Sequence, residues 1–236
     1  MIPKRAMALA AGLGTRMRPL TNDRCKALVE LGGQTLMDYA LDRFASVGLD
    51  QVVVNVHHFA DALEAHLKSR QDHNTIIISD ERDALLETGG GLVKAAPLLG
   101  DDPIYVSNID AVWVDPDGEA LKSLAAAYDP DAHDFCLLLA PLANTLGYDG
   151  AGDFYLLDDG RLERRGARTQ APYVYAGAQI LHPRVLKDQP LEAFSLNRLW
   201  DRALAEGRMI GVEMAPFWMH VGDPKARDEA EARLRS

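Results

Sequence analysis

The sequence predicts an α/β protein built around a Rossmann-like, doubly wound and mostly parallel sheet. Short β-like apolar runs alternate with helix-length amphipathic segments up to about residue 140, a pattern typical of parallel βαβ units. The chain has 236 residues, of which 47% are hydrophobic and 25% charged, so it is long enough to bury a sizeable core. From residue 141 the apolar runs become shorter, and Gly, Asp and Arg clusters separate them. We therefore expect one domain over residues 1–236, in which a smaller lobe, residues 141–236, packs on residues 1–140.

The elements of the first half follow one another as strand and helix. The expected strands are residues 7–9, 51–56, 75–79, 104–107 and 135–140. The expected helices between them are residues 36–47, 60–67, 91–99 and 117–128. In residues 36–47 the apolar side chains recur at close to helical spacing, and Gly48 follows where glycine commonly ends a helix.

The second half is less regular. We expect strands at residues 153–157 and 174–181 and helices at residues 196–206 and 224–234. The sequence has no internal repeat, no low-complexity tract and no linker long enough to release a second domain. We therefore expect the second half to pack onto the first sheet.

Charge and cysteine content exclude several classes of protein. The 35 acidic residues exceed the 25 basic ones and give a net charge of −10, which argues against coating nucleic acid or an anionic membrane. No apolar run approaches the roughly 20 residues of a membrane span, and the apolar stretch near the N-terminus is too short for a secretory signal. With only Cys25 and Cys136, we expect a cytoplasmic enzyme with reduced thiols. We also expect a monomer or a small homo-oligomer.

The strongest chemical signal directly follows the first strand, where the chain reads Leu-Ala-Ala-Gly-Leu-Gly-Thr-Arg-Met-Arg-Pro-Leu-Thr. Gly12 and Gly14 let backbone N–H groups approach a phosphate chain, while Thr15 adds a hydroxyl and Arg16 a fixed charge. Neither the P-loop nor the dinucleotide-binding motif fits, because Met17 stands where the last glycine of G-x-G-x-x-G would be. We predict that a nucleoside triphosphate binds here.

Together with Lys26, this segment resembles the signature of the sugar nucleotidyltransferase family, although the prolines that usually flank the lysine are replaced. The resemblance covers nearly the whole chain and is greatest to the short bacterial N-acetylmuramate-1-phosphate uridylyltransferases. It implies a GT-A-like nucleotidyltransferase fold, with residues 1–140 as the nucleotide-binding half and residues 141–236 as the sugar-binding lobe.

The activity implied by the resemblance is transfer of a nucleotidyl group from a nucleoside triphosphate to a sugar-1-phosphate, which yields an NDP-sugar and pyrophosphate. UTP and N-acetylmuramate-1-phosphate are the expected substrates. Two alternatives stay open. One is a mannose-1-phosphate guanylyltransferase or another hexose-1-phosphate nucleotidyltransferase, and the other is a non-catalytic sensor that binds a nucleotide or a nucleotide-sugar.

The resemblance also implies roles for individual residues. Arg16 and Lys26 would be catalytic, because they would hold the triphosphate and stabilise charge on the transferred phosphoryl group and on pyrophosphate. The implied nucleotide contacts are Leu9, Ala10, Ala11, Gly12, Gly14, Thr15, Glu87, Thr88, Gly89 and Asn108. A hydroxyl-rich sugar needs amides, carboxylates and close backbone, for which the candidates are Asn144, Tyr148, Asp153, Glu163 and Gly177.

A metal site is expected at Asp110, which follows the fourth strand at the edge where open α/β sheets bind ligands. The expected cofactor is Mg²⁺, with Mn²⁺ as the alternative. The family usually has a second metal-binding aspartate where this chain has His220, and an imidazole is a softer ligand than Mg²⁺ prefers. Three interpretations of His220 stay open: it binds a more tolerant ion, it holds a metal-bound water or a phosphate oxygen, or the protein has drifted from efficient catalysis.

Overall fold

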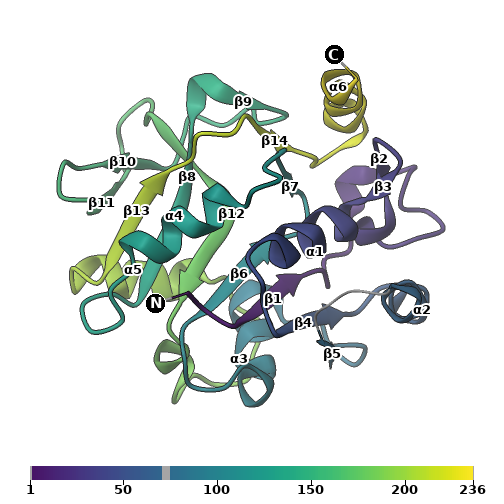
Figure 1. The fold of residues 1–236 in the computed structure, drawn as a ribbon, viewed down its shortest axis with the longest axis horizontal. Helices are drawn as coiled ribbons and strands as arrows, with labels where there is room; N and C mark the ends of the chain where they lie inside the picture. Colours follow the sequence, from purple (N-terminus) through teal and green to yellow (C-terminus); the bar gives the residue numbers. More distant parts are fainter. Residues whose placement is uncertain (1, 71–74, 236) are drawn as a thin grey trace.

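The computed structural model describes residues 2–70 and 75–235, and a large mixed sheet runs through this part of the chain (Figure 1). Four parallel strands form one half of the sheet in the order β6, β1, β4, β5. Their bounds are Ile104–Asn108 for β6, Arg5–Leu9 for β1, Gln51–Val56 for β4 and Thr75–Asp80 for β5. The parallel order and the strand positions confirm the predicted α/β class.

The second half of the chain is joined to the first through the sheet itself. Strand β12 (Tyr173–Leu181) lies antiparallel between β6 and β8 (Phe135–Pro141), and β13 (Met209–Glu213) runs parallel to β8. The sheet ends on this side with β10 (Phe154–Leu156) and β11 (Leu162–Arg164). Residues from both halves therefore meet where β6 and β12 lie side by side.

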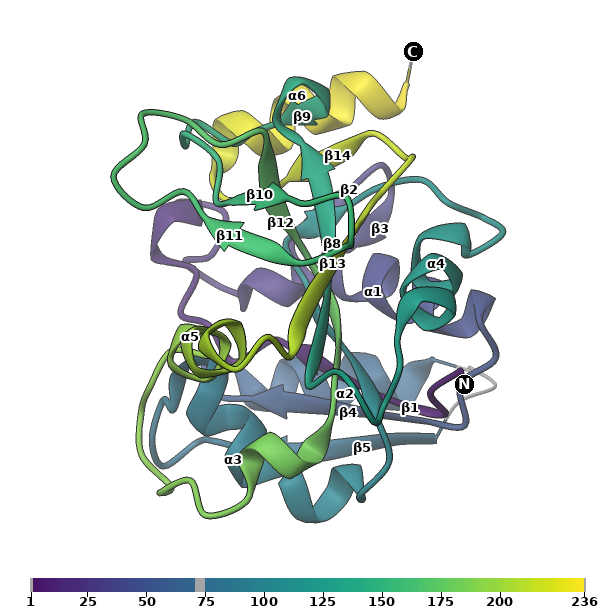
Figure 2. The same ribbon diagram turned by 90° about the vertical axis from the view of Figure 1, so that its left-hand side faces the viewer.

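Helices cover both faces of the sheet (Figure 2). One face is covered by α1 (Leu36–Ser46), α2 (Ala60–Ser69) and α4 (Glu119–Ala127), and the other by α3 (Glu87–Leu99) and α5 (Asn197–Ala205). Side chains of each strand alternate between the two cores, so that Ala6 and Ala8 of β1 lie in one cluster and Met7 in the other. This arrangement confirms the doubly wound fold.

Short elements complete the fold, and most of them were not predicted. A hairpin of β2 (Glu30–Leu31) and β3 (Gln34–Thr35) precedes α1. A small sheet joins β7 (Ala111–Val112), β14 (Trp218–His220) and β9 (Thr145–Leu146). Strands of two or three residues are too short to show alternation in a sequence, and β11 and β14 were missed for this reason.

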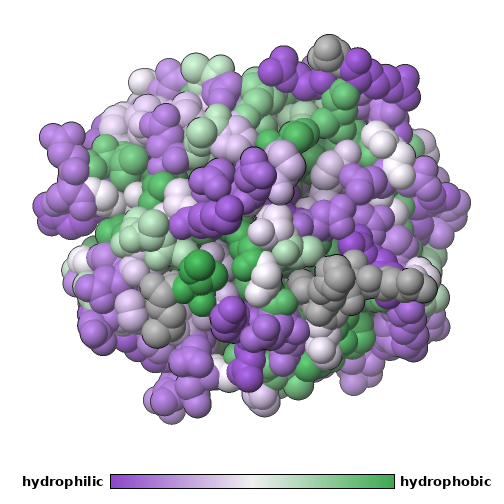
Figure 3. All heavy atoms as spheres, in the orientation of Figure 1, coloured by the Kyte–Doolittle hydropathy of each residue, from purple (hydrophilic) through white to green (hydrophobic). Residues whose placement is uncertain are grey.

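The chain ends in helix α6 (Pro224–Leu234), at the bounds predicted from the sequence. Hydrophilic residues spread over the face shown in Figure 3, with hydrophobic residues in small groups among them. Within the described residues, every helix is too short or too polar to cross a membrane.

Candidate active site

Two adjoining cavities open at the carboxyl ends of β1 and β6, the edge at which open α/β sheets bind ligands. The first has a volume of about 440 Å³ and the second of about 380 Å³. The residues that line both are Leu9, Arg16, Thr88, Asn108, Asp110 and Ser195. Since β1 and β6 are parallel neighbours in which Leu9 pairs with Asn108, their ends supply one shared wall.

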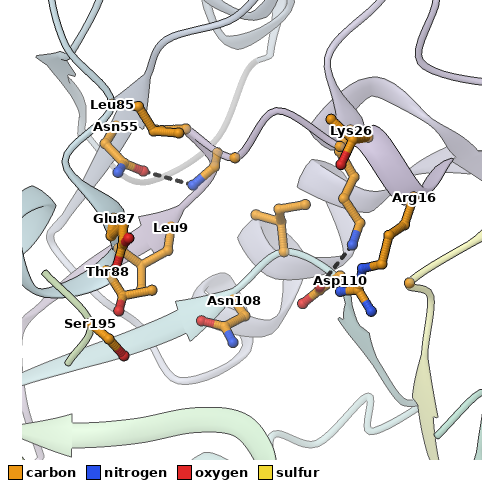
Figure 4. A pocket seen from close by; sticks show the side chains of 17 residues that line it. Leu9, Arg16, Lys26, Asn55, Leu85, Glu87, Thr88, Asn108, Asp110 and Ser195 are labelled. Atoms are coloured by element: carbon orange, nitrogen blue, oxygen red, sulfur yellow. Dashed lines mark hydrogen bonds and ion pairs between the residues drawn. The ribbon is translucent and has the colours of Figure 1, made fainter. Parts of the chain in front are cut away.

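The first cavity gathers most residues of the predicted nucleotide site (Figure 4). From the predicted set it is lined by Leu9, Ala10, Ala11, Gly12, Gly14, Thr15, Arg16, Lys26, Glu87, Thr88, Asn108 and Asp110. Gly14 has a φ of 63°, and a Cβ there would lie 3.0 Å from Lys26 Cβ. A glycine is therefore needed for the glycine loop to turn and for Lys26 to approach it.

Lys26 and Asp110 form an ion pair at the shared wall. Lys26 Nζ lies 2.7 Å from Asp110 Oδ2, and the two side chains are only 11% and 21% exposed. Burial by itself raises the pKa of Asp110, but Lys26 and His220 outweigh it and hold that pKa well below its usual range. Arg16 also extends toward Asp110 (Figure 4). Asp110 is therefore an ionised carboxylate beside two cationic side chains.

His220 lies on the other side of Asp110. Strand β14 pairs with β7, and the Val221 N–H donates to the Asp110 carbonyl oxygen over 2.8 Å. His220 Nδ1 is 3.2 Å from the Gly147 carbonyl oxygen and Nε2 is 3.4 Å from Asp110 Oδ2. Nδ1 therefore faces a carbonyl oxygen, and Nε2 faces the carboxylate.

The second cavity receives only part of the predicted sugar site. Tyr148, Asp153 and Gly177 line it, whereas Asn144 and Glu163 line neither cavity. Asn144 ends a single helical turn after β8. Glu163 is about half exposed and pairs with Arg168, because successive side chains of β11 point to opposite faces of the sheet.

The residue of β11 that lines the second cavity is Arg164, the neighbour of Glu163, although Arg164 was not among the predicted sugar contacts. The cavity is completed by Gln179, Asn197, Trp200 and Trp218, which were not among the predicted sugar contacts. Gly177 has a φ of 79°, and a Cβ there would lie 2.5 Å from Ala111 Cβ, so this glycine lets β12 approach β7 closely.

A buried network behind the first cavity was also missed. The Ala10 N–H donates to Asn55 Oδ1 over 2.7 Å, and Asn55 Nδ2 donates to Glu81 Oε1 over 2.7 Å. Glu81 is fully buried, and burial raises its pKa despite the bond from Asn55. The network connects the glycine loop to the segment before α3. Its position at the ends of β4 and β5 was the available signal, since carboxyl ends of parallel strands carry ligand sites.

The three glycines at the start of α3 serve packing. Helix α3 begins at Glu87 rather than at residue 91, and the Gly89 N–H donates to the Phe194 carbonyl oxygen over 2.8 Å. A Cβ on Gly90 would lie 2.1 Å from the Glu192 carbonyl oxygen. Gly89 lines neither cavity and its amide is already bonded, so its predicted contact with the nucleotide stays a prediction that this geometry does not favour.

Residues 6–144 match the family described as the MobA-like NTP transferase domain. An N-acetylmuramate alpha-1-phosphate uridylyltransferase of Caulobacter vibrioides is 51% identical over 235 residues, covering 98% of this chain and 97% of the relative. The protein of the same name from Neisseria meningitidis serogroup B is 31% identical over 236 residues, covering 97% of each chain. A mannose-1-phosphate guanyltransferase of Aspergillus fumigatus is 28% identical over 94% of this chain and 61% of the relative.

Two solved structures share the fold. A UDP-glucose pyrophosphorylase complexed with UDP-glucose has a TM-score of 0.81 at 16% identity, covering 99% of this chain and 98% of that one. The inositol-1-phosphate CTP transferase from T. maritima has a TM-score of 0.77 at 18% identity, covering 100% and 98%. These likenesses confirm the expected nucleotidyltransferase fold, and the relatives in sequence are sugar-1-phosphate nucleotidyltransferases, which are enzymes. The match over more than half of the chain and the 51% identity over nearly all of it show that the chain belongs to the MobA-like NTP transferase family.

Proposed function

We propose that this protein transfers a uridylyl group from UTP to N-acetylmuramate-1-phosphate, which yields UDP-N-acetylmuramate and pyrophosphate. The observation that carries the proposal is the meeting of two cavities at a wall that includes Arg16 and Asp110, with Lys26 paired to Asp110. The first cavity would hold the nucleotide and the second the sugar, so that their phosphates meet at this wall. The relative that is 51% identical carries the name of this activity.

In this reaction the protein positions the substrates and stabilises charge, and it does not need to transfer a proton. A sugar phosphate oxygen attacks the α-phosphorus of the nucleotide and forms a new oxygen–phosphorus bond. The bond from the α-phosphorus to the oxygen that bridges to the β-phosphorus breaks, and pyrophosphate leaves with the electron pair. Because the attacking oxygen is already an anion, no general base is required. Arg16 and Lys26 would hold two mutually repelling anions together and offset the developing charge.

A divalent ion would bind at Asp110. Within the described residues no three His, Cys, Asp or Glu side chains cluster as a complete metal site. Asp110 would therefore share the ion with phosphate oxygens and water, which is how Mg²⁺ commonly binds in phosphoryl-transfer sites, and Mn²⁺ is the alternative. His220 Nε2 faces the same carboxylate oxygen and fits such a site as an additional nitrogen ligand or as a partner of a bound water. When bound, the ion would neutralise negative charge on the phosphates.

The proposal also bears on compartment and assembly. We propose a cytoplasmic location, where nucleoside triphosphates are available as substrates. A single chain supplies the residues that line both cavities, so the reaction would be compatible with a monomer or with a small homo-oligomer.

A substrate panel tests the proposal. Pyrophosphate release is measured with UTP, GTP, dTTP or CTP against N-acetylmuramate-1-phosphate, mannose-1-phosphate and glucose-1-phosphate, first with Mg²⁺ and then with Mn²⁺. We expect the highest kcat/KM with UTP and N-acetylmuramate-1-phosphate. A preference for GTP and mannose-1-phosphate would instead identify a guanylyltransferase. Nucleotide binding by calorimetry without turnover of any pair would identify a non-catalytic sensor.

A further inference from the structure

The second cavity holds one cation that the proposed phosphate chemistry leaves unused. Among its described lining residues, the arginine and lysine side chains are Arg16 and Arg164. Arg16 also lines the first cavity and extends toward Asp110, where the phosphates would meet. Arg164 lines the second cavity but not the first. It therefore lies away from the shared wall, at the end that the sugar would occupy.

The guanidinium of Arg164 is held in one orientation. Its Nε and Nη2 atoms donate to Asp201 Oδ1 over 3.1 and 2.7 Å. Its central carbon lies 5.0 Å from the ring centroid of Phe154 and 5.6 Å from that of Trp200. Among the described residues Nη1 has no acceptor, and Asp201 is 66% exposed, so water screens the ion pair. Arg164 therefore keeps donors and charge for a second anion.

Tyr175, which also lines the second cavity, offers a further donor. The Tyr175 hydroxyl is buried and has no hydrogen-bond partner among the described residues. The Tyr175 ring meets the Trp200 ring edge-on at 4.8 Å, and the Trp200 indole N–H is fixed by a 3.0 Å bond to Gln179, which is 1% exposed. A buried hydroxyl without a partner is costly, so its presence at a cavity wall points to a ligand that accepts its hydrogen bond.

The carboxylate of Asp153, which lines the second cavity, already accepts hydrogen bonds from other residues of the protein. Asp153 Oδ1 accepts from the Tyr148 hydroxyl over 3.3 Å, and its Oδ2 accepts from the Tyr175 N–H over 3.0 Å. Asp153 is therefore held away from pairing with Arg164, which the structure pairs with Asp201 instead. The guanidinium and the Tyr175 hydroxyl remain as donors for an acidic group on the sugar.

We propose that Arg164 binds a carboxylate carried by the sugar, with Tyr175 as a second donor, and thereby selects an acidic sugar-1-phosphate. The inference rests on the proposed function and deepens it. Since the phosphate of the sugar would lie at the shared wall, an anion near Arg164 must be a substituent of the ring. The lactyl ether of N-acetylmuramate supplies such a carboxylate, and N-acetylglucosamine, which is otherwise the same sugar, lacks it. Guanidinium and carboxylate match in shape as well as in charge.

The test compares N-acetylmuramate-1-phosphate with N-acetylglucosamine-1-phosphate as substrates of Arg164→Met and Arg164→Lys. We expect Arg164→Met to raise KM for the acidic sugar about tenfold or more, as for loss of a charged hydrogen bond. KM for UTP and for the neutral sugar should stay within about twofold. Arg164→Lys should retain part of the preference for the acidic sugar over the neutral one. Tyr175→Phe should reduce this preference less than Arg164→Met does. Arg161→Met is the matched control, because Arg161 lies near the same strand, pairs with Asp159 and lines neither cavity.

The outcomes separate the inference from the proposed function. If the wild-type protein turns over no sugar-1-phosphate with UTP, the proposed function fails. If the wild-type protein prefers the acidic sugar and Arg164→Met keeps that preference, the inference fails while the proposed function stands. An equal rise in KM for both sugars would show a general role in shaping the cavity and would also overturn the inference. Thermal unfolding reports whether each variant folds. If Arg164→Met does not fold, the sugar preference of Arg164→Lys tests the inference.

Discussion

Lys26 and Asp110 are 84 residues apart in the sequence, and their side chains meet at the wall between the two cavities. Each of them is mostly buried, so neither charge is well solvated by water. Removing one partner from such a pair leaves the other charge unbalanced in a poorly solvated place. The pair lies where the transferred phosphoryl group would lie, so substitutions at Lys26 and Asp110 test the proposed transfer most directly.

We expect Lys26→Ala and Asp110→Asn each to lower kcat for pyrophosphate release by about a hundredfold or more, because one well-placed electrostatic contact is typically worth roughly 3 to 4 kcal/mol of barrier. Stopped or continuous pyrophosphate assays would measure the rate, and circular dichroism would confirm that each variant folds. Lys122→Ala is a suitable control, since Lys122 is exposed on α4, pairs with Glu119 and lines neither cavity. A turnover close to that of the wild-type protein in either site variant would contradict the catalytic role.

At the scale of elements, the N-terminus of α1 shows how one side chain connects two helices. Thr35 and Asp38 form a capping box, in which each side chain bonds to the backbone N–H of the other residue. Asp38 Oδ1 also lies 2.6 Å from Arg70 Nη1 and 2.8 Å from His66 Nε2, which belong to α2 and its C-cap. Burial raises the pKa of Asp38, but the bonds from Thr35, Arg70 and His66 outweigh it and lower the pKa to about 2.

We expect Asp38→Asn to lower the free energy of unfolding at pH 7 by about 2 to 3 kcal/mol. The folded pKa lies below the value of about 3.9 in an unfolded chain, so ionised Asp38 contributes stability above that value. This contribution is lost as the pH falls toward 2, and the difference between wild type and variant should shrink over that range. Urea unfolding at several pH values would measure it, with the exposed Asp61→Asn as the control. A difference that does not depend on pH would argue against the ionised carboxylate.

At the scale of the whole molecule, the segment from Glu192 to Leu196 holds the two halves in register at the site. The Phe194 carbonyl oxygen accepts from Gly89, and the Leu196 N–H donates to Thr88 Oγ1 over 2.9 Å. Ser195, between these anchors, lines both cavities. The start of α3, which lines the first cavity, therefore positions a segment that also lines the second cavity.

Gly90→Ala tests this coupling. On helix propensity alone, alanine in place of glycine would stabilise α3 by about 1 kcal/mol. Because the new Cβ would lie 2.1 Å from the Glu192 carbonyl oxygen, we expect instead a lower melting temperature and a higher KM for both substrates. Thermal unfolding and initial-rate kinetics would measure the two effects. A gain in melting temperature with unchanged KM values would show that the contact is unimportant.

Much of this molecule could be predicted from local pattern. The spacing of apolar residues located α1, an apolar run located β4, and the glycine loop with Asp110 marked one edge of the sheet as the candidate site. Contacts between distant, irregular segments could not be predicted. Glu163 was predicted as a sugar contact, but the sequence of a three-residue strand does not show which side chain faces the cavity, and the structure places Arg164 there. Gly89 was expected at the nucleotide, and its N–H bonds to a segment about a hundred residues later.

The α/β class, the glycine turn after the first strand and the position of Asp110 at a strand end could be predicted from the sequence, because they depend on short-range periodicity and on backbone freedom. The resemblance placed His220 at the second metal position, and the tertiary structure added its contact with Asp110 and the position of Arg164 on the second cavity. The His220 contact depends on pairing of β14 with β7, which lies far away in the sequence, whereas the position of Arg164 depends on which face of the β10–β11 hairpin meets the cavity. The free energy of such contacts comes from packing across the whole sheet, so the local sequence pattern does not predict them.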